Sequence, residues 1–314
     1  MIDKASGFSS RILLHIGLPK TGTTSLQELF FSSHPEVRYF GQTNVWHDPE
    51  ANTVLRALLL GRSADIAAAR TILANAAVQR PAIVISDEAL TLGEFMLRAT
   101  RWPVRSDHIA MARRAREVLG DAQVLIVLRN QADWLQSWHF QGLKSGKYAE
   151  TYYRAWIDRD LGASAERLLG LLEYDVLYTA YRDVFGQHQV HVRFYEQYRD
   201  QFEDLAAECA GLICIDADRA RRLVLEGEAR NVSGSRFEGL PPILKRFATQ
   251  GLIERILNTL PVGALRLLRN LVVRDRSFYP LSEADRSAIR ERFAAGNARL
   301  QRALGLSDSP SSYH

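Results

Sequence analysis

A lysine and a row of hydroxyl side chains lie in a short loop between an apolar run and the start of a helical pattern. The segment from residue 13 to residue 27 reads LLHIGLPKTGTTSLQ. Gly17 and Gly22 have the spacing of the Walker A loop, but Thr23 takes the position of its lysine, and Lys20 lies inside the loop. Backbone amides at the start of a helix, with the positive end of its dipole behind them, attract anions. The loop is therefore predicted to bind phosphate, through Lys20, Thr21, Gly22, Thr23, Thr24 and Ser25.

A second pattern suits a terminal phosphate. The apolar run Gln123–Leu128 ends in Arg129, and Ser137 follows eight residues later, two turns along the predicted helix. An arginine fork combined with a hydroxyl is well matched to a phosphate dianion. We therefore treat Arg129 and Ser137 as a second candidate anion site.

Short apolar runs predict the strands that position these side chains. The runs are apolar on both faces, as strands of a covered parallel sheet are: Arg11–Ile16, Ala82–Ser86, Gln123–Leu128 and Gln189–Phe194. Helical patterns lie between or after them: Thr23–Ser33, Ala51–Ala77, Ser106–Leu119, Gln131–Leu143 and Gln197–Leu212. This alternation predicts an α/β fold, a three-layer sandwich with a central parallel sheet, with its binding crevice at the carboxyl ends of the strands.

The strand signals end near residue 216, so we divide the chain into a core over 1–215 and a mainly helical region over 216–314 that completes the same domain. Residues 236–276 hold eight Lys or Arg against three Asp or Glu. This segment is either a helical cover over the acceptor site or a surface that touches anionic lipid. A further helix is expected over Ser282–Leu304, where Ser282 and Asp285 form an acidic capping box.

Composition excludes several classes of protein. The chain has 314 residues, of which 46% are hydrophobic and 24% charged, as in globular proteins. No apolar run approaches the roughly 18 residues of a membrane span, and the first eleven residues lack a secretion signal, so a cytoplasmic protein is expected. Its two cysteines, Cys209 and Cys214, make a disulfide framework or a cysteine zinc site implausible. The net charge of +4 slightly favours anionic partners, and no motif indicates nucleic acid or an oligomeric state.

The segment PKTGTTSLQ, placed after an apolar strand, resembles the 5′-phosphosulfate loop of sulfotransferases that use 3′-phosphoadenosine 5′-phosphosulfate (PAPS), in both their cytosolic and Golgi-type branches. The spacing from Arg129 to Ser137 is similar to the 3′-phosphate element of the same family. The resemblance covers residues 11–215 in ordered patches. It implies a P-loop-like fold, PAPS as donor, 3′-phosphoadenosine 5′-phosphate (PAP) as product, and sulfuryl transfer to a hydroxyl group.

The resemblance also implies roles for individual residues. Tyr195, in VRFYEQY, is similar to the tyrosine at a strand end that contacts adenine in the cytosolic enzymes. Arg230 and Ser233, in RNVSGS, lie in the interval where those enzymes carry a basic, glycine-containing loop for the 3′-phosphate. Lys20 would stabilise the departing phosphate oxygen. No metal is expected, because a sulfuryl group bears less charge than a phosphoryl group.

The acceptor hydroxyl needs a general base. Cytosolic relatives have a histidine after the strand that corresponds to Ala82–Ser86, whereas Golgi-type enzymes often use glutamate. Here that strand is followed by Asp87 and Glu88, so we expect Glu88 to be the base, with Asp87 second. Both carboxylates could equally cap a helix that begins near Ala89. His15 and His139 are expected to pack in the interior.

Two other functions stay open. In a P-loop kinase or NTPase, residues 83–88 would be the Walker B strand, although the missing Walker lysine argues against this. A non-catalytic nucleotide- or anion-binding module is also compatible with the charge. For a sulfotransferase, the helical C-terminal region and Glu88 favour a saccharide or glycolipid acceptor.

Overall fold

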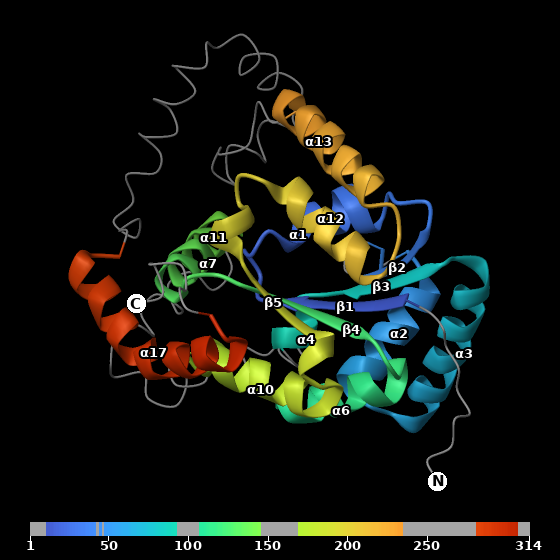
Figure 1. Cartoon of the computed structure of the whole chain (residues 1–314), viewed down its shortest axis with the longest axis horizontal. Coiled ribbons are helices and arrows are strands. Elements are labelled where there is room, and N and C mark those ends of the chain that lie inside the picture. Colours follow the sequence, from blue (N-terminus) through green and yellow to red (C-terminus); the bar gives the residue numbers. More distant parts are fainter. Residues whose placement is uncertain are drawn as a thin grey trace.

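The computed structural model describes residues 11–41, 44–45, 47–92, 107–145, 169–234 and 281–306, with the backbone alone for 139–145 and 228–234. Its centre is a five-stranded parallel sheet in the order β2-β3-β1-β4-β5 (Figure 1). The strands are β1 (Arg11–Gly17), β2 (Val37–Gly41), β3 (Ala82–Ser86), β4 (Gln123–Leu128) and β5 (Val190–Phe194). The chain crosses β1 when it passes from β3 to β4, so the strand order reverses at β1. A ligand crevice is expected at the carboxyl ends of the strands at such a point.

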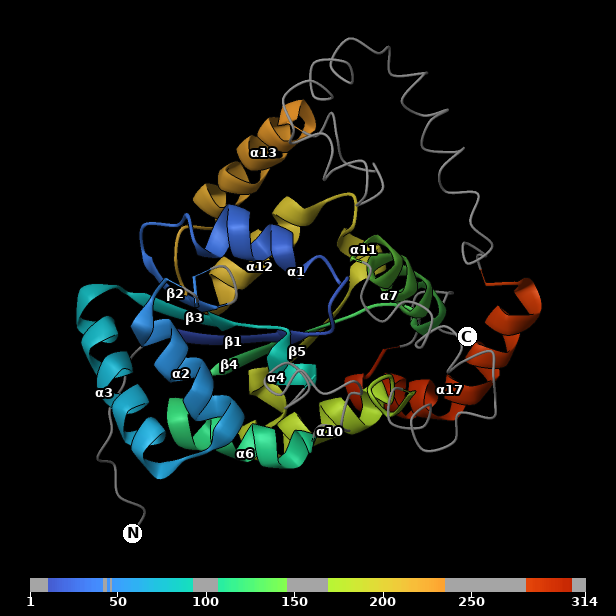
Figure 2. The same cartoon turned by 180° about the vertical axis from the view of Figure 1, so that it is seen from behind.

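Helices cover both faces of the sheet, which is why its strands are apolar on both sides (Figures 1 and 2). Leu14, Ile83 and Ile126 pack towards α2 (Pro49–Leu60), α3 (Ser63–Gln79), α6 (His108–Leu119) and α10 (Tyr174–Phe185). Leu13, Val84 and Leu125 pack towards the π-helix η1 (Leu26–Phe31), α12 (Phe202–Leu212) and α13 (Ala217–Gly234). The predicted three-layer α/β architecture is thereby confirmed.

The remaining described helices are short or lie at the carboxyl ends of the strands. They are α1 (Thr23–Ser25), α4 (Ala89–Leu92), α7 (Gln131–Ser145), η3 (Gln187–Gln189), α11 (Tyr195–Tyr198) and α17 (Glu283–Leu304). Among the residues that the structure describes, no helix is long and apolar enough to cross a membrane.

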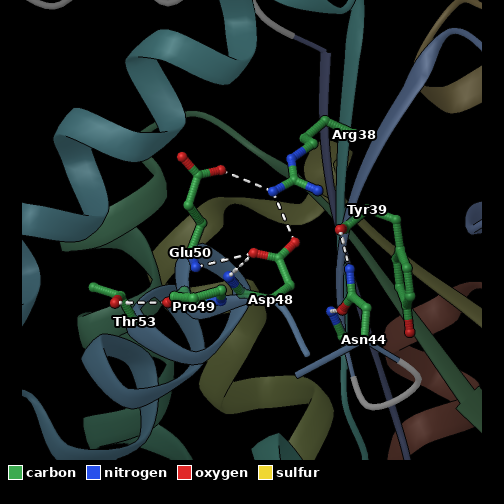
Figure 3. Close-up of polar contacts among 9 residues, drawn as sticks. Arg38, Tyr39, Asn44, Asp48, Pro49, Glu50 and Thr53 are labelled. Carbon is green, nitrogen blue, oxygen red and sulfur yellow. Dashed lines mark hydrogen bonds and ion pairs between the residues drawn. The ribbon is translucent and has the colours of Figure 1, made fainter. Parts of the chain in front are cut away.

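Polar contacts join β2 to the start of α2 (Figure 3). The Asp48 carboxylate accepts from the backbone N–H of Glu50 at 2.9 Å and of Ala51 at 3.2 Å, and Pro49 opens the helix. Arg38, in β2, forms ion pairs of 2.8 Å with both Asp48 and Glu50. An N-cap with proline at the first helical position is a strong helix start, so α2 begins at a defined residue.

The four predicted strands are confirmed to within one residue, but β2 and α10 were missed. The single helix predicted over 51–77 is wrong, because the structure has two helices here. Gly61 ends α2 with a positive φ of 65°, a conformation that glycine adopts without strain. The helix predicted over 23–33 is likewise divided between α1 and η1.

The C-terminal helix α17 begins with the predicted capping box, in which Ser282 and Asp285 each bond the other's backbone N–H. It packs against α10 and α7. Gln131 of α7 donates to the Asn297 amide oxygen at 2.8 Å, and Arg286 bonds Asp133 at 2.7 Å. The helix is therefore joined to the element that directly follows Arg129. The basic segment 236–276 lies outside the described residues.

Candidate active site

Four strand ends meet around one cavity. The loop after β1, Glu88 after β3, Arg129 after β4 and Tyr195 after β5 all contribute to it, as expected for the carboxyl edge of a parallel sheet. The cavity has a volume of about 500 Å³, in the range of small-ligand sites. Its lining comprises Pro19, Lys20, Gly22, Thr23, Thr24, Glu88, Arg129, Trp138 and Tyr195.

The loop after β1 is held in an unusual backbone conformation. Lys20 has a φ of 70° and Gly22 a φ of 79°, and such values are uncommon outside glycine. A Cβ atom at Gly22 would lie only 1.9 Å from the ring of Phe202. The Trp134 indole donates to the Pro19 carbonyl at 2.6 Å, and the Thr21 hydroxyl donates to the Leu18 carbonyl at 2.7 Å. These contacts keep the loop in the shape that presents Lys20 to the cavity.

Among the residues that the structure describes, Glu88 is the carboxylate that lines the cavity. Its Oε1 accepts a hydrogen bond of 2.7 Å from the Thr23 hydroxyl of the loop. Burial raises the pKa of Glu88 above its ordinary value, while the Thr23 hydrogen bond and the positive charge of Lys20 act in the opposite direction. A carboxylate with a raised pKa is a stronger base once it is ionised.

Asp87 caps a helix, which is the alternative to the catalytic role that the sequence left open. Its carboxylate accepts from the backbone N–H of Ala89 at 2.8 Å and so caps α4. Burial raises the pKa of Asp87 to about 6. Asp87 is not among the residues that line the cavity.

Arg129 carries a positive charge into the cavity without a carboxylate partner among the described residues. Its Nη1 donates to the Lys20 carbonyl at 2.7 Å, and its guanidinium carbon lies 4.7 Å from the centre of the Tyr195 ring. The backbone carbonyl of Arg129 accepts from the Tyr174 hydroxyl at 2.7 Å. Arg193 and Arg286, by contrast, are paired with acidic side chains. The guanidinium of Arg129 is thus positioned and available for an anion.

Most of the predicted site residues gather in the cavity: Lys20, Gly22, Thr23, Thr24, Glu88, Arg129 and Tyr195. Thr21, Ser25 and Ser137 are not among its lining residues. Arg230 and Ser233 lie in the last turns of α13, where the resemblance implied a loop, and only their backbone is described. The side chain of His139 also lies outside the description.

His15 is an interior residue, as predicted. Only 1% of it is exposed, and burial lowers its pKa to about 3. Its ring is therefore neutral under ordinary conditions.

Trp138 lines the cavity from α7 and was not predicted from the sequence to be a site residue. Its ring stacks on that of Trp134 with centroids 5.5 Å apart and planes 10° from parallel. The spacing of four residues in a predicted helix was the signal that could have paired the two rings. Among the described residues, no three His, Cys, Asp or Glu side chains gather as a metal site would require.

One solved structure covers nearly the whole chain. It is a sulfotransferase from Alicyclobacillus acidocaldarius, which matches over 97% of this chain and 99% of its own, with a TM-score of 0.56 and 14% sequence identity. No protein-family model matches the chain, and no curated protein matches its sequence. The likeness establishes a shared fold, a parallel sheet flanked by helices.

Proposed function

We propose that the protein is a sulfotransferase that moves a sulfuryl group from PAPS to an acceptor hydroxyl. The observation that carries the proposal is the single cavity that joins the loop of Lys20, the carboxylate of Glu88 and the guanidinium of Arg129. This transfer needs cations that bind two anionic groups of one nucleotide, and a base that deprotonates the acceptor. The shared fold with a bacterial sulfotransferase agrees with it.

In the proposed complex, the 5′-phosphosulfate lies on the loop after β1 and the 3′-phosphate on Arg129. The hydrogen bond of 2.7 Å from Arg129 to the Lys20 carbonyl supports this arrangement, because it joins the residue proposed for the 3′-phosphate to the loop proposed for the 5′-phosphosulfate. Tyr195, whose ring lies under the guanidinium, supplies an aromatic surface for adenine. Arg230 and Ser233 remain proposed 3′-phosphate ligands.

Glu88 acts as the general base. It takes the proton of the acceptor hydroxyl while that oxygen attacks sulfur in line, and the bond from sulfur to the phosphate oxygen breaks. The negative charge that develops on the departing PAP is stabilised by Lys20 and by the backbone amides of the loop. No step in this scheme requires a metal ion.

We further propose a saccharide or glycolipid as the acceptor, with residues 216–314 completing the domain and covering the acceptor. Trp138 supports this assignment, because an indole in the same cavity as the base offers a flat apolar surface for a ring-bearing alcohol. The docking of α17 on α7 places the described end of this region beside the cavity-lining helix.

A P-loop kinase is the less favoured function. Thr23 stands where the Walker lysine would contact the β- and γ-phosphates, and its hydroxyl is committed to Glu88. That position therefore offers no cation to a triphosphate.

Thermal-shift titration with PAP, beside ATP with Mg²⁺, tests the proposal. PAP is expected to raise the Tm in proportion to the logarithm of its concentration, and Lys20→Ala and Arg129→Ala should remove most of the shift. Incubation with ³⁵S-labelled PAPS and a panel of saccharides, glycolipids and phenols should then label an acceptor. Stabilisation by ATP with Mg²⁺ alone, and none by PAP, would reject the sulfotransferase in favour of the kinase.

A further inference from the structure

A buried polar network lies at the end of β3, immediately before Glu88 and outside the cavity. The Ser86 hydroxyl lies 2.7 Å from Nδ1 of His15 and 2.9 Å from Nε2 of Gln27. Each of these three residues is only 1% exposed. Polar side chains this deeply buried are costly unless they bond one another, so their presence in an apolar layer calls for a reason.

The backbone brings the three residues together from three elements. His15 in β1 is the direct partner of Ser86 in the parallel pairing of β1 with β3, so their side chains share one face of the sheet. That face is covered by η1, which carries Gln27. The Ser32 N–H bonds the Gln27 carbonyl, an i to i+5 bond that marks the π-turn. Such turns are frequent near functional sites.

The Ser86 carbonyl can only accept a hydrogen bond, and this fixes which groups of the network donate and which accept. Nε2 of Gln27 also lies 3.3 Å from the Ser86 carbonyl, so the amide must present its N–H₂ group here and not its oxygen. The Ser86 oxygen thus accepts from Gln27 and gives its own proton to Nδ1 of His15. A neutral ring can accept it, and burial keeps this ring neutral by lowering its pKa to about 3.

Ser86 is therefore held at both its side chain and its carbonyl. The Tyr39 hydroxyl, from β2, also approaches the Ser86 carbonyl at 3.4 Å. Two residues further along the chain, Glu88 accepts its hydrogen bond from Thr23 of the loop. The base is thus fixed from the loop on one side and through the backbone of Ser86 on the other.

We propose that His15, Gln27 and Ser86 are positioning residues, which hold the end of β3 so that the Glu88 carboxylate is aimed at the acceptor hydroxyl. None of the three lines the cavity, so they act through Glu88 and do not touch substrate. The inference rests on the proposed function in one respect, that Glu88 is the base. It predicts that the network sets the orientation and hydration of Glu88, whereas PAP binding depends on Lys20 and Arg129.

The test compares Ser86→Ala, His15→Leu and His15→Asn in the full chain. Asparagine can place its amide oxygen near the position of Nδ1, so it is the conservative variant. Ser86→Ala and His15→Leu should lower kcat for sulfuryl transfer about 10- to 100-fold, since small misplacements of a reacting group have effects of this size. PAP affinity should stay within about 2-fold, and His15→Asn should recover most of kcat.

The pH profile gives a readout that general destabilisation would not move. In the described part of the chain, the charged groups around Glu88 are Lys20, Asp87 and Arg129, and all are unchanged in these variants. A Glu88 side chain that is no longer held in place gains hydration, so its pKa should fall. The loss of kcat/KM at acidic pH, called the acid limb of the profile, should therefore move to lower pH. Leu73→Ala, buried in α3 on the opposite face of the sheet, is the control for lost stability and should leave the limb in place.

The inference would be overturned if Ser86→Ala kept the kcat and the acid limb of the wild type. It would also be overturned if Leu73→Ala changed kcat and the acid limb as much as Ser86→Ala does. Failure of the proposed function is distinguishable, because wild type would then neither bind PAP nor transfer sulfate. In that case a ¹³C NMR titration of the Glu88 carboxyl, assigned with Glu88→Gln, still decides. The same Glu88 pKa in wild type, Ser86→Ala and His15→Leu would contradict the positioning role.

Discussion

Glu88 and Lys20 have opposite charges in one small cavity, and the proposed chemistry uses both. Only the ionised carboxylate can accept a proton, and burial raises the pKa of Glu88 above its ordinary value. Activity should therefore be lost as the pH falls through that raised pKa. Glu88→Gln should lower kcat at least about 100-fold while PAP affinity changes little, measured by steady-state kinetics and calorimetry. Retention of wild-type kcat and its acid limb in Glu88→Gln would assign the base to another residue.

Asp87 has a structural role, so its ionisation should change the free energy of unfolding of the protein. Its folded-state pKa of about 6 lies above the unfolded value of roughly 3.9, so ionisation destabilises the fold by about 1–3 kcal/mol. The penalty is complete above pH 6 and disappears below pH 4. The Tm of Asp87→Asn relative to wild type should therefore be higher at pH 8 than at pH 5. A Tm difference that does not vary with pH would contradict this explanation.

At the scale of elements, the loop after β1 depends on the close approach of α12. Gly22→Ala should be doubly unfavourable, because φ is 79° and the Phe202 ring occupies the space of a Cβ atom. Gly305 provides a matched control, since it shares the left-handed conformation of Gly22 with a φ of 65°, and the space that a Cβ atom would take there is open to a distance of 4 Å. Both substitutions should cost about 1–2 kcal/mol from backbone strain. Only Gly22→Ala should also weaken PAP binding, by about 10-fold or more in calorimetry; equal affinities in the two variants would contradict the role of this packing.

The junction between α7 and α17 contains a buried amide pair, Gln131 with Asn297. Replacing one partner by leucine removes the hydrogen bonds between the two side chains while the other amide stays buried, which should cost about 1–3 kcal/mol. Replacing both should cost clearly less than the sum of the single changes. Urea unfolding of the four proteins of this double-mutant cycle measures the coupling, and additive losses would show that the two amides do not depend on each other.

For the whole molecule, the sequence was informative where local chemistry and long-range structure coincide. Apolar runs predicted β1, β3, β4 and β5, and the side chains that follow them reached one cavity because parallel strands share a carboxyl edge. The strand β2 was missed because Val37–Gly41 contains Arg38 and ends in glycine, so it lacks a long apolar run. The position of Trp138 in the cavity could not be predicted, since it depends on the rotation of α7 about its axis. The Ser86 network could not be predicted either, since it depends on the π-turn of η1.

The central claim is that one nucleotide bridges the loop of Lys20 and the guanidinium of Arg129. Calorimetric titration with PAP and with adenosine 5′-monophosphate, which lacks the 3′-phosphate, tests it most directly. Wild type should bind PAP at least about 10-fold more tightly than the monophosphate, because a charge-assisted phosphate contact contributes about 1.5–3 kcal/mol. Arg129→Ala should lose most of this preference for PAP, and Lys20→Ala should weaken the binding of both nucleotides. If Arg129→Ala keeps the wild-type preference for PAP, the account is wrong.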